Sequence, residues 1–181
     1  AFMDEESAKA LEAQGVAVVE DSGRGYRRVV ASPKPKNITN LVSIQDALKN
    51  HHVVVCAGGG GIPVVSTNQG YVGVEAVIDK DSASSLLASQ LDVDVLFILT
   101  AVEKVAINYG KPSQKWLTTM SIEETKQYIK EGHFAPGSML PKVEAALDFV
   151  NGKKNKTTII TLLDKASEAL SGETGTRIVS D

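Results

Sequence analysis

Three short uncharged runs of mostly β-branched or apolar residues, separated by segments with helical periodicity, constrain the fold of this chain more than any other feature. They cover residues 53–57, 95–100 and 157–161. No charged residue interrupts them, which is typical of strands buried on both faces of a parallel sheet. Helical patterns cover residues 41–49, 80–91, 121–130, 140–150 and 163–170, and residues 177–180 are expected to form an edge strand. Strands that alternate with helices indicate an α/β layered fold with a largely parallel sheet.

Local signals mark where two of these helices begin. Ser121 and Glu124 have the spacing of a capping box, and Gly132 follows as a stop signal. Ser138 is a suitable N-cap for the next helix. Pro141 suits the first turn of that helix, because proline lacks an N–H that would have no helical partner there.

The first 36 residues have a different pattern. Residues 4–14 are expected to form a helix with Asp4 as N-cap and Gly15 as its end. Residues 16–19 and 27–30 flank the turn-forming residues 21–25, which predicts a β-hairpin. The proline-containing residues 32–36 then favour an extended exit. We therefore expect a small mobile subdomain over residues 1–36 and an α/β lobe over residues 37–181.

Composition excludes several classes of protein. Hydrophobic residues make up 43% of the chain and charged residues 23%, which is ordinary for a globular domain. A net charge of −3 argues against a nucleic-acid partner. The single cysteine, Cys56, falls in an apolar run, so we expect an inert core residue and a reducing, cytoplasmic environment. No signal peptide or membrane-spanning run is evident.

Four consecutive glycines, residues 58–61, follow the first apolar run. Glycine backbone allows close approach of a ligand, so the run could form an anion cradle of N–H groups. A flexible turn is the alternative. Pro63 stands where a Rossmann fingerprint needs its third glycine, and no Gly-Lys-Ser/Thr follows, which excludes a Walker A loop.

Two lysines are expected in the first turns of helices. Lys80 lies between Asp79 and Asp81, and Lys142 follows Ser138 and Pro141. A cation is disfavoured at a helix N-terminus by about 0.3–1 kcal/mol unless an anion is near. Both lysines make sense if a polyphosphate lies between them, with Asp81 orienting their ammonium groups and Asp79 or Asp81 near Mg²⁺. Solvated charged helix ends are the alternative.

Other features carry weaker signals. An apolar segment around Thr100 and Tyr109 could hold a nucleotide base or pack on its own core. The histidines, residues 51, 52 and 133, have no metal-binding spacing. A basic cluster without an acid among its members could be a lid face that attracts an anionic substrate or a solvated hairpin face; its members are Arg24, Arg27, Arg28, Lys34 and Lys36.

Five segments together closely resemble the carbamate kinases of the amino-acid kinase superfamily. They read EDSGRGYRRVV at 20–30, CAGGGGIPV at 56–64, GVEAVIDKD at 73–81, INYGKP at 107–112 and HFAPGSMLPK at 133–142. They occur in order over essentially the whole chain. The resemblance implies a three-layer α/β/α sandwich with part of a protruding lid. It also implies an ATP-dependent phosphotransferase with a carboxyl-group acceptor, carbamate, that uses Mg²⁺ with ATP or ADP, works in arginine breakdown and forms a homodimer.

The resemblance also assigns roles to residues. Lys80 and Lys142 neutralise the transferred phosphoryl group, and Asp81 orients them. The four glycines, Gly58, Gly59, Gly60 and Gly61, lie on the substrate side. The nucleotide pocket is formed by Thr100, Ala101, Val102, Val105, Tyr109, Pro112, Ala135, Pro136, Gly137, Ser138 and Met139.

The chain departs from the family pattern at its start. The family begins with a strand leading to a Gly-Gly-Asn loop, continues with a Gly-Asn-Gly segment and carries a lid lysine in a Lys-Pro-Ile-Gly-Pro-Phe stretch, none of which is present here. We therefore expect part of a longer enzyme, inactive by itself. A non-catalytic nucleotide-binding module, or another amino-acid kinase such as an acetylglutamate or uridylate kinase, are the alternatives.

Overall fold

The computed structural model describes residues 2–21 and 23–180. The chain divides into two compact units: a first unit of residues 1–33 and 62–78, and a second unit of residues 34–61 and 79–181. The elements are α1 (Glu5–Glu12), β1 (Val18–Glu20), β2 (Tyr26–Arg28), α2 (Leu41–Lys49), β3 (Val64–Thr67), β4 (Gly70–Gly73), α3 (Lys80–Gln90), β5 (Val95–Thr100), β6 (Val105–Ile107), β7 (Lys115–Leu117), β8 (Thr119–Met120), α4 (Ile122–Lys130), α5 (Met139–Val150), β9 (Thr157–Leu162), a 3-10 turn (Leu163–Lys165), α6 (Ala166–Ser171) and β10 (Thr176–Val179).

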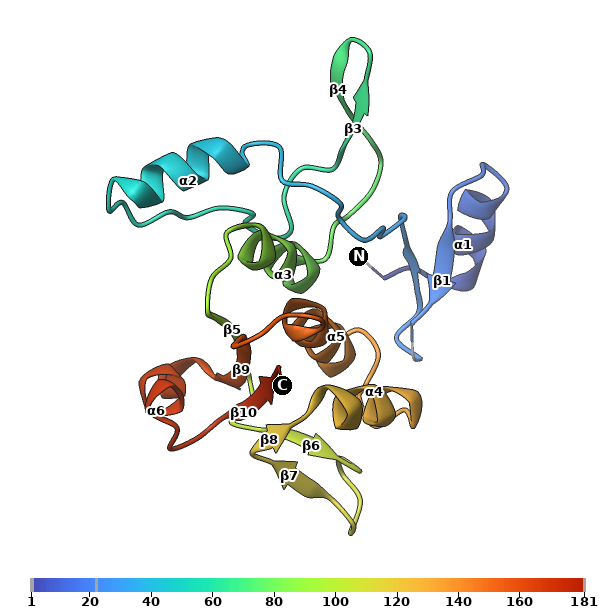
Figure 1. The fold of residues 1–181 in the computed structure, drawn as a ribbon. Helices are drawn as coiled ribbons and strands as arrows, with labels where there is room; N and C mark the ends of the chain where they lie inside the picture. The colour runs from blue at the N-terminus through green and yellow to red at the C-terminus, as the bar shows by residue number, and fades with distance from the viewer. Residues whose placement is uncertain (1, 22, 181) are drawn as a thin grey trace. The chain divides into compact units, whose positions relative to one another are not determined.

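The second unit is built on a four-stranded sheet with the order β5-β9-β10-β8. β5 runs parallel to β9, and β10 runs parallel to β8, whereas β9 and β10 are antiparallel. Helices α4 and α5 cover one face of the sheet, and α6 packs against β9 from the other face (Figure 1). This arrangement confirms the predicted three-layer α/β/α fold with a largely parallel sheet.

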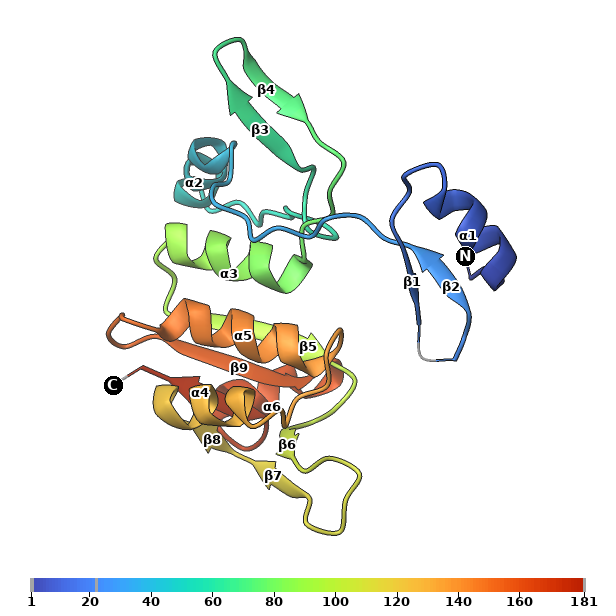
Figure 2. The same cartoon turned by 90° about the vertical axis from the view of Figure 1, so that its right-hand side faces the viewer.

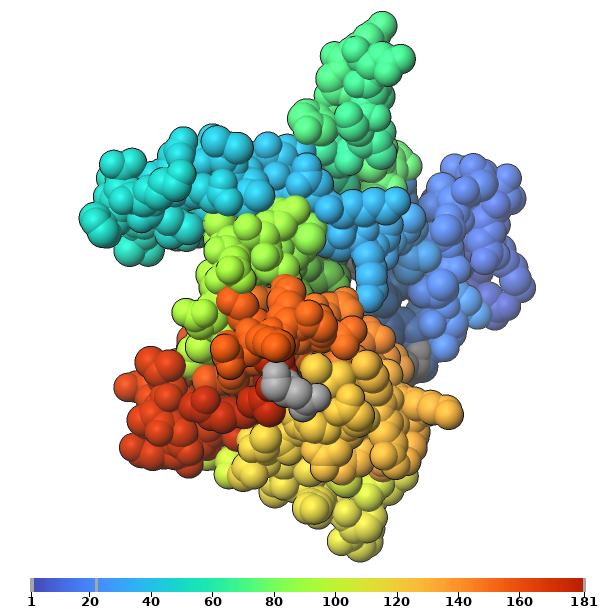
Figure 3. Space-filling view, viewed as in Figure 1, coloured from blue at the N-terminus to red at the C-terminus, as the bar shows by residue number. Residues whose placement is uncertain are grey.

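Helix α5 supplies much of the core of this unit. Val143, Ala146, Phe149 and Val150 recur along one side of the helix and are completely buried. They pack with Ile160 and Ile178 of the sheet and with other buried residues of the unit. Figure 2 shows α5 lying along β9 and β5, and in Figure 3 the surfaces of α4 and α5 meet without a gap.

The predicted helix starts agree with the structure. Asp4 caps α1 by accepting a hydrogen bond from the backbone N–H of Ser7. The Ser121–Glu124 capping box at α4 is present in both directions. Ser138 does stand at the N-cap position of α5, but its side chain makes no capping hydrogen bond. Among the described residues, no helix has both the length and the apolar character needed to cross a membrane.

The first unit contains the predicted hairpin, in which β1 and β2 pair antiparallel. Ser22, in the predicted turn, lies outside the described residues. A second hairpin of β3 and β4 was not predicted, and it joins this unit through a bridge between Ala31 and Ala76 and a hydrogen bond from the N–H of Val77 to the carbonyl of Ala31. A lid formed by residues 1–36 remains a prediction, because the division into compact units does not show that one unit closes over a site.

The predicted strand over residues 53–57 is wrong. Within the described parts of the chain no strand pairs with this run, and Val53 and Val55 are 95% and 94% exposed. Cys56 is accordingly half-buried and not a core residue. A strand buried on both faces needs neighbouring strands to take its hydrogen bonds. The apolar run alone does not supply them.

Two further expectations are corrected. Residues 177–180 do not form an edge strand, because β10 lies between β9 and β8. The region after Thr100 is not only loop: β6 and β7 form a two-stranded antiparallel ribbon in which Val105 faces Leu117. Strands of three residues leave too short a pattern for recognition in the sequence.

Candidate active site

The candidate site lies at the N-termini of α3 and α5, two helices that pack against each other. Helix α3 begins at Lys80 because the Asp79 side chain accepts a hydrogen bond from the N–H of Ser82 at 2.9 Å. Helix α5 begins at Met139, which places Lys142 within its first turn. Each helix N-terminus carries a partial positive charge.

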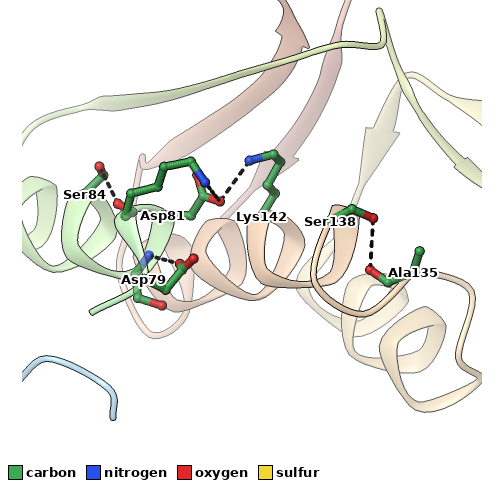
Figure 4. A network of polar contacts seen from close by, with 8 residues as sticks. Asp79, Asp81, Ser84, Ala135, Ser138 and Lys142 are labelled. Carbon is green, nitrogen blue, oxygen red and sulfur yellow. Dashed lines mark hydrogen bonds and ion pairs between the residues drawn. The ribbon is translucent and has the colours of Figure 1, made fainter. Parts of the chain in front are cut away.

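Asp81 joins the two helices. Its Oδ2 accepts a hydrogen bond from Lys142 Nζ at 2.9 Å and lies 3.7 Å from Lys80 Nζ. In Figure 4 the Lys142 side chain extends from α5 toward the Asp81 carboxylate on α3. The side chains of Asp81 and Lys142 are only 9% and 12% exposed. The structure therefore brings together the three residues that were predicted to be catalytic.

The charges of this cluster leave an excess of one positive charge. One carboxylate is shared by two ammonium groups, next to the positive ends of two helices. The Lys80 side chain is 58% exposed, whereas Lys142 is held by a partly buried ion pair. Such an arrangement attracts a multiply charged anion, and burial strengthens that attraction.

The turn before α5 leaves backbone N–H groups without a side-chain cap. The Ser138 hydroxyl contacts the carbonyl of Ala135 at 3.4 Å, away from the helix N-terminus (Figure 4). Ala135, Pro136, Gly137 and Ser138 are exposed, and Met139 is half-buried. Gly137 has a φ of 73°, which favours glycine. The preceding Phe134 is buried and anchors the turn to the core.

The other predicted nucleotide residues lie at the end of β5 and on the β6–β7 ribbon. Thr100 ends β5 half-buried, Ala101 is exposed and Val102 is half-buried. Tyr109 and Pro112 are exposed in the loop that joins β6 to β7. The Tyr109 ring lies 6.2 Å from the ring of Trp116 in an edge-on arrangement, and this partner was missed in the sequence.

Val105 differs from the other predicted nucleotide residues because its side chain is completely buried in the core. It supports the ribbon from inside and presents no side-chain surface to a ligand. If Val105 affects nucleotide binding, it does so through its backbone and not through its side chain.

Two amides of the glycine run are hydrogen-bonded to backbone carbonyls just before them, and Gly60 is buried. The N–H of Gly58 donates to the carbonyl of Cys56 at 2.8 Å, and the N–H of Gly60 donates to the carbonyl of Ala57 at 2.7 Å. These two amides therefore do not point into an anion cradle. Gly58, Gly60 and Gly61 all have positive φ, a backbone that L side chains rarely adopt.

Comparison with known proteins identifies the family. The model of the "Amino acid kinase family" matches residues 4–161. The chain belongs to this family. The Escherichia coli "Carbamate kinase-like protein YqeA" is 50% identical over 177 residues, and "Carbamate kinase" of Clostridium perfringens is 51% identical over 178. Both matches cover 98% of this chain and 57% of the relative, so the chain spans a little over half the length of these relatives.

Solved structures agree with the family assignment. "Carbamate kinase from Giardia lamblia bound to AMP-PNP" matches with a TM-score of 0.89 and 45% sequence identity, over 100% of this chain and 58% of that one. A structure from Aeropyrum pernix matches with a TM-score of 0.90 and 44% identity. The amino acid kinase fold of this chain is thus shared with nucleotide-bound carbamate kinase.

The contacts of Asp79 and Asp81 bear on whether the protein itself could hold a metal ion here. The described part of the chain has no group of three His, Cys, Asp or Glu side chains that could hold one. Both carboxylates that were expected near Mg²⁺ are engaged: Asp79 caps α3, and Asp81 binds Lys142 and Lys80. These residues do not fit a metal site of their own.

Acidic residues contact the basic cluster of the N-terminal part of the chain. Asp21 contacts Arg24 at 2.8 Å and Arg27 at 2.7 Å, and the hydrogen bond from Arg24 holds the pKa of the Asp21 carboxyl below its usual value. Lys34 pairs with Asp148 at 2.9 Å, which raises the pKa of Lys34. Three of the five cations are therefore partly neutralised, which weakens the interpretation as an anion-attracting face.

Proposed function

We propose that this chain supplies the nucleotide lobe of a carbamate kinase, which transfers a phosphoryl group reversibly between ATP and carbamate. The observation that carries this proposal is the cluster of Lys80, Asp81 and Lys142 at the N-termini of α3 and α5. The identity of about 50% to proteins named carbamate kinase supports the choice of carbamate over the substrates of other amino-acid kinases, such as acetylglutamate or uridylate kinases.

The proposed roles follow from the chemistry of phosphoryl transfer. A carbamate oxygen attacks the γ-phosphorus of ATP, the bond to the bridging oxygen breaks, and ADP leaves with the electron pair of that bond. Charge builds up on the transferred oxygens and on ADP, so fixed cations lower the barrier. Lys142, oriented by Asp81, contacts the transferred group, and the more exposed Lys80 contacts it from the other helix. The phosphates of the nucleotide, and not a site of the protein, would hold Mg²⁺, which would add positive charge at the transferred group.

The nucleotide is proposed to lie against the turn before α5 and the β6–β7 ribbon. The pocket comprises Thr100, Ala101, Val102, Val105, Tyr109, Pro112 and residues 135–139. Glycines 58–61 are assigned to the carbamate side, and residues 1–36 to part of a lid. A homodimer and a cytoplasmic role in arginine breakdown complete the proposal, supported by the resemblance to carbamate kinases.

A second candidate is a nucleotide-binding module without turnover. It is favoured by one observation: Val53, Val55 and three of the four glycines, all on the proposed carbamate side, are exposed. This module would bind ADP but transfer nothing.

The test is ATP formation from carbamoyl phosphate, ADP and Mg²⁺, with the intact mass of the protein recorded on the same preparation. Activity in a protein well above 19.2 kDa supports a complete kinase that contains this lobe. Activity at 19.2 kDa overturns our division of the site, because this chain alone would then suffice. ADP binding without activity in a protein of the relatives' full length supports the second candidate. Faster turnover of acetylglutamate or UMP than of carbamate, with ATP as donor, overturns the substrate assignment.

A further inference from the structure

A buried threonine hydroxyl connects the sheet to the β6–β7 ribbon. Thr176, the first residue of β10, is completely buried. Its Oγ1 accepts a hydrogen bond from the N–H of Val105 at 2.8 Å and donates one to the carbonyl of Leu117 at 2.5 Å. Val105 and Leu117 face each other in the ribbon, so one hydroxyl holds both of its strands.

Water cannot replace the hydrogen bonds of this hydroxyl, because the residues that it binds are buried. Val105 and Leu117 are buried, and a buried amide or carbonyl left without a partner is destabilising. A hydroxyl can donate and accept at once, which a methyl group of the same size cannot do. Thr176 is therefore specific for this position through its chemistry as well as its shape.

Neighbouring contacts anchor the segment that leads into the ribbon. The Thr161 hydroxyl on β9 donates to the carbonyl of Glu103 at 3.3 Å, and the Thr174 hydroxyl contacts the Glu103 carboxylate. On the far side, the N–H of Arg177 donates to the carbonyl of Thr118 at 2.9 Å. The segment between Ala101 and the ribbon is thus held from beneath by β9, β10 and the residues before β10.

We propose that Thr176 is a positioning residue for nucleotide binding. Its hydroxyl fixes the base of the β6–β7 ribbon, and the ribbon carries Tyr109 and Pro112 at its exposed end. Thr176 does not touch the nucleotide, because it is buried beneath the ribbon. This inference rests on the proposed function, in which that exposed end forms one wall of the nucleotide pocket.

The test compares Thr176→Val with Thr176→Ser and with Thr158→Val. Thr158 is a matched control: it is also completely buried in the sheet, but its hydroxyl donates to Ala146 on α5. Affinity for ADP is measured by calorimetry, and stability by urea unfolding. We expect Thr176→Val to weaken ADP binding about tenfold. The variant leaves the Val105 N–H and the Leu117 carbonyl without their partner, and the ribbon should shift so that these groups find other partners. Thr176→Ser should restore affinity to within about twofold, and Thr158→Val should lower stability without weakening ADP binding.

The inference is overturned if ADP affinity is unchanged in Thr176→Val, or if it is weakened equally in Thr158→Val. Hydrogen exchange at the Val105 amide gives an independent readout that needs no nucleotide. It should accelerate in Thr176→Val relative to the amides of Ile159 and Ile160, and Trp116, the single tryptophan of the chain, should report the displacement by fluorescence. If the wild-type chain does not bind ADP, the proposed function fails and the nucleotide role of Thr176 fails with it. If ADP binds and exchange at Val105 is unchanged, only the role of Thr176 fails.

Discussion

The N-termini of α3 and α5 and the glycine run of residues 58–61 are both predicted to contact phosphate, and the structure holds them in different ways. At the helices, Asp81 and Lys142 form a partly buried ion pair between two packed elements. At the glycine run, the hydrogen bonds are local, from Gly58 to Cys56 and from Gly60 to Ala57. One region is fixed by contacts between residues far apart in the sequence, and the other by its nearest neighbours.

The difference follows from where each region finds its partners. Lys142 and Asp81 lie on helices that pack on one sheet, so the core of the second unit fixes their separation. The run of residues 53–57 that leads to the glycines pairs with no strand among the described residues, and Val53 and Val55 are exposed. The chain spans 57% of the length of its relatives. The proposed nucleotide side therefore has long-range contacts within this chain, whereas the hydrogen bonds of the proposed carbamate side are local.

The largest effect is expected for Lys142→Met. In the active enzyme, loss of this charge should lower kcat for ATP formation by about 10²–10³-fold, because a fixed cation on the transferred group is removed. The variant should also lose about 3 kcal/mol of stability, because the Asp81 charge is left in a buried position without its principal partner.

The double variant Asp81→Asn/Lys142→Met separates these two effects. Removal of both charges should restore most of the stability but none of the activity. Full activity in either variant would show that Lys142 has no part in the transfer. The difference between the helix N-termini and the glycine run would then say nothing about catalysis.

A pair of apolar substitutions tests the packing side of the comparison. Phe149→Ala should cost about 3–4 kcal/mol of unfolding free energy, because it opens a cavity in the core beneath α5. Val55→Ser should change stability by less than about 0.5 kcal/mol, because that side chain is almost fully exposed. Urea unfolding measures both. Surface substitutions usually change stability by no more than about 0.5 kcal/mol. A loss of more than about twice that amount in Val55→Ser would mean that residues 53–57 are packed against the rest of the chain.

Gly59→Ala sharpens the comparison at the glycine run. No atom lies within 4 Å of a Cβ built at Gly59, and its φ is not in the left-handed region, so stability should stay within about 0.5 kcal/mol of wild type. If the run approaches carbamoyl phosphate closely, the KM for that substrate should rise severalfold while ADP affinity is unchanged. An increased KM for ADP alone would place the run on the nucleotide side instead.

The smallest effect concerns an ion pair that is more exposed than Asp81–Lys142. Lys156 contacts Asp92 at 2.8 Å, and this hydrogen bond lowers the pKa of Asp92 in the folded state. The unfolded chain therefore binds this proton more tightly. The stabilisation is present above the ordinary aspartate pKa of about 3.9 and is lost as pH falls through the lower folded value. Thermal unfolding of Asp92→Asn should depend less on pH than that of the wild type as the pH falls below about 4. Parallel pH profiles would contradict the prediction.

Much of the second unit can be predicted from the sequence. The bounds of α2, β5 and β9 are predicted to within one residue, because each has a clear apolar pattern and end signals. Residues 53–57 have the same apolar pattern as β5 but do not form a strand. The apolar pattern shows which side chains a strand could bury. It does not show whether neighbouring strands are present to form the backbone hydrogen bonds.

The site shows the same limits. The placement of Lys80 and Lys142 against the helix dipoles predicts a shared anion, and the structure brings both lysines to Asp81. Thr176 could not be found in this way, because its partners Val105 and Leu117 lie 71 and 59 residues away in the sequence. A lone threonine in an apolar strand has no pattern that names its hydrogen-bond partners.

The most direct test of the central claim compares the affinities of ADP and AMP-PNP for the wild-type chain and for Lys142→Met, with circular dichroism confirming that the variant is folded. If Lys142 contacts the group that is transferred, the wild-type chain should bind AMP-PNP more tightly than ADP, and Lys142→Met should lose that preference while it retains affinity for ADP. An equal preference for AMP-PNP in both proteins would contradict the account, because the γ-phosphate would then be bound without Lys142.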